Sequence, residues 1–192
     1  MTGMPIDPDA VLRALYEAVS RFAPSDAETS TDPDRRAQQL AKAASLKAAA
    51  FSGTLALPAG PAGLLTIIPD LLMIWRLQGR MVADIAAVYG KTTFLTREGM
   101  LHCLFKHAAA HAMAGIVVRT GGGLLIRKAS AGLLRSALGR VGLALSERLA
   151  SRSLTRWLPV VGAAGAGAYA YYDTARVART AIEVFASEIR LA

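Results

Sequence analysis

The stretch LTIIPDLLMIWRLQGRMVADIAAVYG, Leu65–Gly90, decides the fold. At about 100° per residue, its charged residues Asp70, Arg76, Arg80 and Asp84 share one third of a helix circumference, and its large apolar residues lie elsewhere. The spacing predicts an amphipathic helix from about residue 61 that ends at Gly90, a C′ glycine. Arg76 and Arg80 repel each other at i,i+4 unless an anion lies near. Two interpretations follow: a solvated face, or a face that meets an anionic partner.

The segment before this helix, Ala48–Pro69, carries no charge. It approaches the length of a membrane span, but prolines and glycines interrupt it, so one straight spanning helix is not expected. An apolar helical hairpin around Pro58–Gly63 is the predicted structure.

The C-terminal region repeats this design. WLPVVGAAGAGAYAYY, Trp157–Tyr172, has no charge and is rich in small residues, and a polar stripe with Asp173 and Arg179 follows. Asp-x5-Arg thus occurs at Asp70/Arg76 and again at Asp173/Arg179. If the two helices lie side by side, we expect Asp70 to meet Arg179 and Asp173 to meet Arg76.

Helical spacing dominates the rest of the chain, so we predict an all-α fold, a compact bundle of about six helices. Asp-Pro-Asp at Asp7–Asp9 and at Asp32–Asp34 indicates two helix starts, the second leading to a helix from Pro33 to about Leu57. Residues 1–32 form an N-terminal helix and polar linker, and residues 33–192 form the main helical domain. A further helix is expected from Thr96 to about Arg119, and the glycines that follow separate it from the next helix.

Composition points to an anionic partner. The 192 residues are 53% hydrophobic and only 6% aromatic, and the net charge is +8, which favours phospholipid headgroups or nucleic acid. The single cysteine, Cys103, fits a reducing compartment. The first residues lack the basic region of a secretory signal, so we expect a cytoplasmic protein.

Most of the basic excess lies in residues 124–156. The apolar stripe of Leu134, Leu138, Val141, Leu145 and Leu149 there predicts an amphipathic helix, of the kind that lies on an anionic bilayer or forms the basic outside of a bundle. Nucleic acid is the less favoured partner because aromatic residues for base stacking are missing. The candidate lipid- or partner-binding residues are Arg76, Arg80, Arg127, Lys128, Arg135, Arg148, Arg152 and Arg156.

Catalytic and metal-binding patterns are weak. Cys103, His107 and His111 share a helix face at i, i+4 and i+8, beside His102, but a second ligand cluster is missing. Nucleophile elbows and paired carboxylates are also missing. We therefore expect a protein without enzymatic activity, cofactor or metal.

Two segments resemble the EcsC family of bacterial proteins: IIPDLLMIWRLQGRMVADIAAVYG, Ile67–Gly90, and LPVVGAAGAGAYAYYDTARVARTAIEVF, Leu158–Phe185. The resemblance covers about residues 46–189. It implies a helical domain from a family named after an operon with a transporter pair, and it carries no catalytic residue over. We treat six positions as structural. Asp70, Gly90, Pro159 and Gly162 match the family pattern, and Asp173 and Arg179 are added from the repeat described above.

Together these observations predict a helical protein at the cytoplasmic face of the inner membrane. The apolar hairpins would dock it, and the arginine-rich helix would meet anionic phospholipid. The alternatives are a soluble adaptor for a transporter or secretion partner, and a carrier of a hydrophobic ligand.

Overall fold

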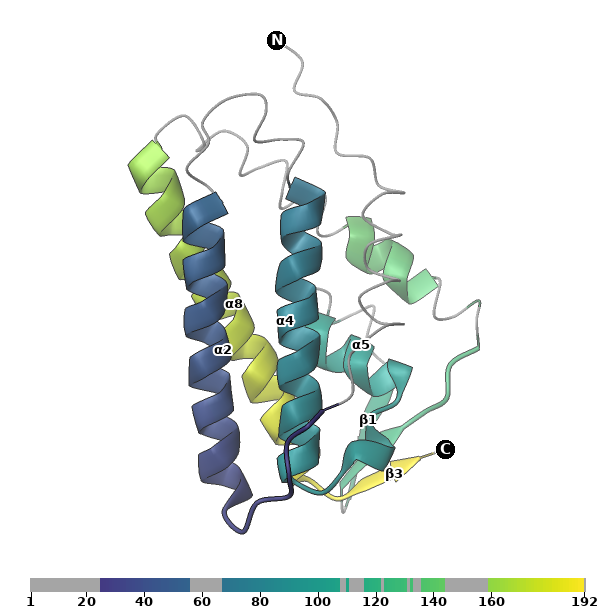
Figure 1. The fold of residues 1–192 in the computed structure, drawn as a ribbon. Coiled ribbons are helices and arrows are strands. Elements are labelled where there is room, and N and C mark those ends of the chain that lie inside the picture. Colours follow the sequence, from purple (N-terminus) through teal and green to yellow (C-terminus); the bar gives the residue numbers. More distant parts are fainter. Residues whose placement is uncertain are drawn as a thin grey trace.

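The computed structural model describes residues 25–55, 67–107, 110, 116–121, 123–130, 132, 136–143 and 159–191, with backbone alone at 53–55, 67–71 and 159–163. Three long helices stand side by side: α2 (Pro33–Leu55), α4 (Ile67–Val88) and α8 (Pro159–Ala186) (Figure 1). The short helices η1 (Thr92–Phe94) and α5 (Arg97–Phe105) follow α4, and residues 136–143 are also helical. The predicted hairpin turn and the predicted helix near the N-terminus lie outside the described residues.

Helix α2 begins where its sequence predicts. Asp32 is the N-cap: its Oδ1 accepts a hydrogen bond from the Arg35 amide at 3.2 Å, and Pro33 takes the N1 position. The buried side of α2 consists of small side chains, namely Ala37, Ala44, Ser45 and Ala48. Small side chains let two helix backbones approach closely, and α2 packs chiefly against α8.

Helix α4 ends at the predicted glycine. Gly90 has φ +67°, and its amide donates to the Ala87 carbonyl while the Lys91 amide donates to the Ala86 carbonyl, both at 2.8 Å. This pair of bonds is a Schellman motif, which places Gly90 at C′ because a side chain there would strain the left-handed backbone. The prediction for Gly90 is confirmed.

Side-chain contacts set the register of the long helices. Gln78 donates to Asp173 and Thr174, and Lys91 donates to the carbonyls of Phe185 and Ser187, always across 94–96 residues of sequence. A constant offset means that α4 and α8 run parallel. Helix α2 is antiparallel to both, because the Tyr89 hydroxyl at the end of α4 meets Asp34 at the start of α2.

This register contradicts the predicted pairing of Asp70 with Arg179. With an offset of about 95, the level of Asp70 on α8 is residue 165, which is 14 residues from Arg179. At 1.5 Å per residue the two positions are about 21 Å apart along the axes. Asp173 instead lies beside Gln78. The repeat in the sequence is offset by 103 residues, so it does not match the contacts in space.

A small sheet is the main departure from the all-α prediction. Strands β1 (Val117–Thr120), β2 (Gly123–Ile126) and β3 (Ile189–Leu191) form the order β1-β2-β3, antiparallel and then parallel. The helix predicted to reach Arg119 starts as expected, with the Thr96 hydroxyl accepting from the Gly99 amide, but α5 ends at Phe105. Within the described part, five helices have complete bounds, where about six were predicted.

The core lies where α4, α5, α8 and the sheet meet. Its largest buried side chains include Ile85, Phe105 and Phe185, and the ring of Trp75 contacts Phe105 edge-on with 5.6 Å between centroids. In Figure 1 the sheet lies at the end of the bundle where α4 and α8 finish. In the half of the bundle from which α4 and α8 begin, the helical segment 136–143 lies at the height of the first part of α4 (Figure 1).

Candidate functional site

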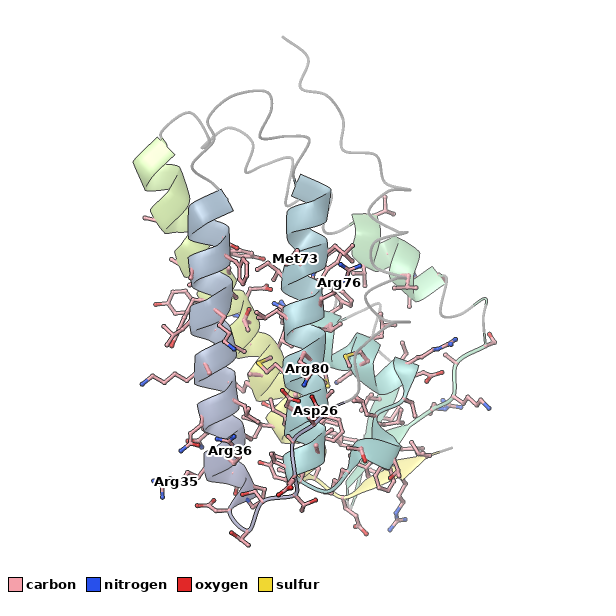
Figure 2. All side chains as sticks on the ribbon, in the orientation of Figure 1. Asp26, Arg35, Arg36, Met73, Arg76 and Arg80 are labelled. Atoms are coloured by element: carbon pink, nitrogen blue, oxygen red, sulfur yellow. The ribbon has the colours of Figure 1, made fainter. Side chains whose placement is uncertain are left out.

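The two arginines of α4 have different surroundings. Arg80 is paired with Asp26 at 2.6 Å and with Asp84 at 3.5 Å, and the Ser25 hydroxyl also donates to Asp84 at 2.7 Å. The hydrogen bond that Arg80 donates to Asp26, followed by the charges of both carboxylates, raises the pKa of Arg80. The anion that a closely spaced arginine pair needs is therefore supplied to Arg80 by the protein itself. Arg76 is exposed about one turn nearer the other end of α4 (Figure 2).

The basic region is divided between two places. Arg127 and Lys128 are exposed directly after β2, and Arg140 is exposed on the helical segment 136–143. Leu138 and Val141 of that segment are buried in the core. The two described residues of the predicted apolar stripe thus face the protein, as in the second of the two predicted forms, a helix with a basic outside. Four of the candidate residues, Arg135, Arg148, Arg152 and Arg156, lie outside the described residues.

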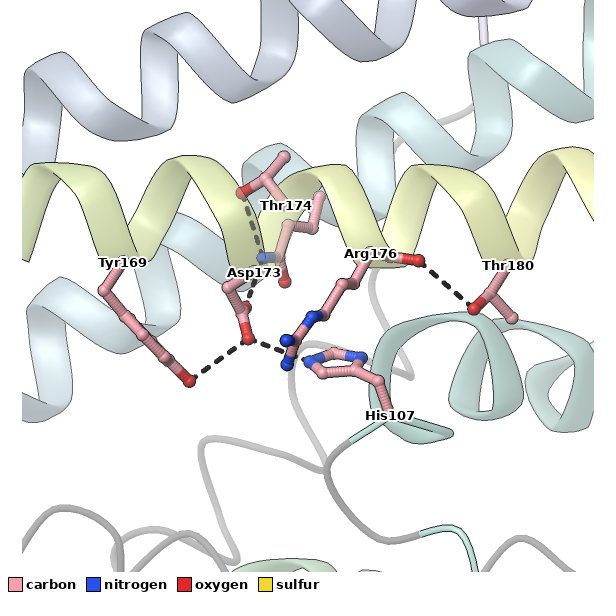
Figure 3. Close-up of polar contacts among 7 residues, drawn as sticks. His107, Tyr169, Asp173, Thr174, Arg176 and Thr180 are labelled. Carbon is pink, nitrogen blue, oxygen red and sulfur yellow. Dashed lines mark hydrogen bonds and ion pairs between the residues drawn. The ribbon is translucent and has the colours of Figure 1, made fainter.

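A polar cluster joins α4, α8 and the turn after α5. The carboxylate of Asp173 lies 2.8 Å from His107 Nε2, and it accepts hydrogen bonds from Gln78 at 2.9 Å and from the Tyr169 hydroxyl at 3.2 Å (Figure 3). Gln78 also donates to Thr174 at 3.1 Å. Polar groups in the interior need such partners, because an unpaired one costs about 1–3 kcal/mol. The cluster fixes the helices in their register.

Electrostatics keep this carboxylate charged. Burial raises the pKa of Asp173. The hydrogen bond and charge of His107, with the hydrogen bonds from Gln78 and Tyr169, have a larger effect in the opposite direction, so the pKa lies below its ordinary value. The Nδ1 atom of His107 is buried without a hydrogen-bond partner. Because that nitrogen has no access to a substrate, the Asp–His pair fits a structural role better than general base catalysis.

The described candidates for metal ligands, His102, Cys103 and His107, are not grouped as a metal site. Cys103 lies on α5, whereas His107 lies in the turn after that helix, so the two do not share a helix face. Burial raises the pKa of Cys103 to about 12, and burial followed by the charge of Lys106 lowers the pKa of His102 to about 4. Within the described ranges no three His, Cys, Asp or Glu residues are grouped to hold a metal ion. His111 lies outside them.

The other residues interpreted from the sequence as structural lie on helices α4 and α8. Pro159 is the first residue of α8 and Gly162 lies in its first turn, whereas Arg179 is exposed further along. Asp70 belongs to the first turn of α4, where only the backbone is described. The polar segment before α2 contacts α4, since the Ser30 amide donates to the Val88 carbonyl at 3.0 Å.

Large apolar side chains are exposed on all three long helices. They are Leu46 and Phe51 on α2, Met73 on α4, and Tyr169 and Tyr172 on α8, with exposed fractions from 37% to 66%. Each lies in the half of its helix that is away from the sheet, and Figure 2 shows Met73 in that half of α4. We call this half the apolar end, defined by these five residues. None of the helices in the described part is both long and apolar enough to cross a bilayer.

Comparison with protein-family models, with curated proteins and with solved structures finds no match to this chain. The likeness to the EcsC family therefore depends on the two sequence segments quoted above.

Sequence reasoning missed two parts of this arrangement. Gln78 lies about 200° around α4 from both Arg76 and Arg80, so it is a polar residue on the apolar face, and that position alone predicts a buried hydrogen-bond partner. Asp26 and Arg80 are 54 positions apart in the sequence, so no local pattern predicts their contact.

Proposed function

We propose that this chain is a non-enzymatic helical protein of the EcsC type that associates with the cytoplasmic face of an anionic membrane. The observation that carries the proposal is the apolar end: five large apolar side chains on three neighbouring helices are exposed in the same half of the bundle. Isolated exposed apolar residues are ordinary, whereas a group on neighbouring elements is typical of a membrane or protein contact.

The sequence around the apolar end supports a bilayer as the partner. The uncharged segments Ala48–Pro69 and Trp157–Tyr172 together contain 38 residues without a charge, and their described parts, 48–55, 67–69 and 159–172, lie in this half of the bundle. The protein as a whole has a net charge of +8, so long-range attraction brings it toward anionic headgroups.

Partial insertion fits the dimensions better than a full span. From Tyr172 back to Pro159, α8 extends 13 residues, about 20 Å, against a hydrocarbon core of about 30 Å. A protein that enters one leaflet binds by buried apolar area together with charge attraction.

Sedimentation with vesicles tests the proposal. The full chain is mixed with vesicles of phosphatidylcholine and phosphatidylglycerol at a ratio of 7:3, and with vesicles of phosphatidylcholine alone, in 50 mM and in 500 mM NaCl. We expect strong binding to the anionic vesicles at low salt and weaker but measurable binding at high salt, because screening removes the charge attraction and leaves the apolar contribution. If the chain stays in the supernatant with anionic vesicles at low salt, the proposal is wrong and a protein-binding adaptor takes its place.

A further inference from the structure

We infer that the bundle docks on the membrane end-on, with its apolar end in the bilayer and its sheet facing away. This inference depends on the proposed membrane function and adds an orientation to it. The sequence predicts that the apolar hairpins dock the protein and that the arginine-rich residues 127–156 meet anionic phospholipid, without an orientation for the bundle.

The exposed apolar residues occupy two levels of the bundle, about 8 Å apart. Met73 precedes Gln78 by five residues and Tyr169 precedes Thr174 by five, and Gln78 and Thr174 are hydrogen-bonded to each other. Because α4 and α8 are parallel, Met73 and Tyr169 therefore lie level, about 8 Å above that contact.

Helix α2 reaches the same heights from the other direction. Its start is tied to the end of α4 by Asp34 and Tyr89. Leu46 is 12 residues beyond Asp34, about 18 Å, and Gln78 is 11 residues from Tyr89, so Leu46 lies at the height of Gln78. Phe51 lies about one turn higher, near the level of Met73.

Exposed cations occur along the three long helices, including Arg35, Arg36 and Lys42 toward the sheet end of α2, whereas the exposed acids among their described side chains are confined to the sheet end. Lys47 and Arg76 are exposed close to the lower edge of the apolar end, and Arg176 and Arg179 follow further down α8. Among the described side chains of the three long helices, the exposed acids are Asp34 and Glu183, both near the sheet end. The cations nearest the apolar end would lie at the depth of lipid phosphates, and tyrosines are favoured at the same interface.

Two of the basic residues expected to meet lipid, Arg127 and Lys128, lie at the sheet end of the molecule, whereas the helical segment 136–143 lies beside the other half of α4 (Figure 1). Arg127 follows β2, which pairs with β3, and β3 lies just after the end of α8. The stretch of α8 from Tyr172 to Ala186 spans 14 residues, about 21 Å, which is twice the screening length of about 10 Å at 0.1 M salt. A flat bilayer in contact with the apolar end does not reach Arg127 or Lys128.

Depth-dependent fluorescence tests the orientation. In a Cys103→Ala background, which removes the single, buried cysteine, Phe51→Cys or Tyr172→Cys places an environment-sensitive fluorophore at the apolar end. Arg36→Cys and Leu191→Cys place it near the sheet end. With anionic vesicles that contain nitroxide-labelled lipid, we expect a blue shift and quenching at the first two sites and neither change at the other two.

A matched pair of charge substitutions gives a second readout. Leu46 and Leu191 are similarly exposed, at 54% and 50%, but lie at opposite ends. Leu46→Glu is expected to weaken partition to anionic vesicles about tenfold, because a charge replaces apolar area that the bilayer would bury. Leu191→Glu is expected to change partition less than about twofold, and circular dichroism checks that both variants fold.

Different results would contradict the membrane function and the end-on orientation. Absence of binding by the unsubstituted chain overturns the membrane function and the orientation together. Binding with no response at residues 51 and 172, or with equal losses for Leu46→Glu and Leu191→Glu, overturns the end-on orientation and leaves the membrane function standing.

Discussion

The Nε2 atom of His107 lies 2.8 Å from Oδ1 of Asp173, which connects the turn after α5 to the middle of α8. The two residues are 66 positions apart in the sequence. Because Asp173 also accepts from Gln78, one carboxylate links three separate elements of the bundle. A contact of this kind therefore stabilises the placement of the three elements relative to one another.

The variant Asp173→Asn is expected to lower the free energy of unfolding by about 1–3 kcal/mol at pH 7, because His107, Gln78 and Tyr169 lose their shared charged acceptor. The pKa of Asp173 is lowered in the folded protein, so its contribution is present above the ordinary carboxyl pKa of about 3.9 and is lost as pH falls through the folded pKa. Urea unfolding at pH 7, 5, 4 and 3 should show the difference between the two proteins shrinking below about pH 4.

Glu183→Gln is the matched control. Glu183 is paired with Lys106 at 3.3 Å, but both side chains are more than two-fifths exposed. Exposed pairs contribute about 0–1 kcal/mol, so this variant should remain close to the parent protein. Equal losses for the two variants would contradict the special role of the buried carboxylate.

His102→Leu is expected to flatten the pH dependence of stability in weakly acidic solution. Burial and the charge of Lys106 lower the pKa of His102 to about 4, and its Nδ1 atom is buried without a partner. Between the unfolded pKa of about 6.5 and the folded value, the unfolded chain binds a proton that the folded chain does not. Stability is therefore complete above about pH 6.5 and falls by about 3 kcal/mol as pH drops to about 4.

Two measurements examine this prediction. Urea unfolding of both proteins from pH 7.5 to pH 4.5 should show a steeper loss in the parent than in His102→Leu. A nuclear magnetic resonance titration of the His102 ring in the folded parent should give a midpoint near pH 4. A midpoint near 6.5, or parallel stability curves, would show that the histidine is charged in the fold.

Local signals in the sequence predicted the ends of helices well. Asp32 followed by Pro33 marks the start of α2, and Gly90 marks the end of α4, because capping depends on residues within one or two turns. The ion pair of Arg80 with Asp84 is local in the same sense, because its two residues are four positions apart on one helix.

Non-local relationships were not predictable in the same way. Strand β3 has three residues and pairs with β2, more than 60 positions earlier, so neither periodicity nor length reveals it. The run of β-branched residues and glycines around Val117 and Gly123 does resemble a β-hairpin, a signal that the dominant helical pattern concealed. Helix register is likewise a packing result, which a repeat in the sequence does not specify.

A substitution at Gly123 tests the pairing of strands β2 and β3, which the sequence did not predict. The carbonyl oxygen of Glu188, just before β3, accepts from the Leu124 amide at 2.8 Å. A Cβ atom at position 123 would contact that oxygen closely and would lie 3.0 Å from the carbonyl carbon. The obstruction is backbone, which cannot rotate away as a flexible side chain would.

Gly123→Ala should therefore force β3 away from β2 and lower the free energy of unfolding by about 1–3 kcal/mol, as overpacking does elsewhere. Gly121→Ala is the control in the same hairpin: a Cβ there would meet nothing within 4 Å, and its backbone has no positive φ. That variant should be neutral or more stable by about 0.4–1 kcal/mol, because alanine restricts the unfolded chain. Urea unfolding distinguishes the two signs, and faster hydrogen exchange of the Leu124 amide in Gly123→Ala alone would localise the damage to the contact between β2 and β3. If both alanines behaved alike, the parallel pairing of the C-terminal strand would not be the contact that Gly123 protects.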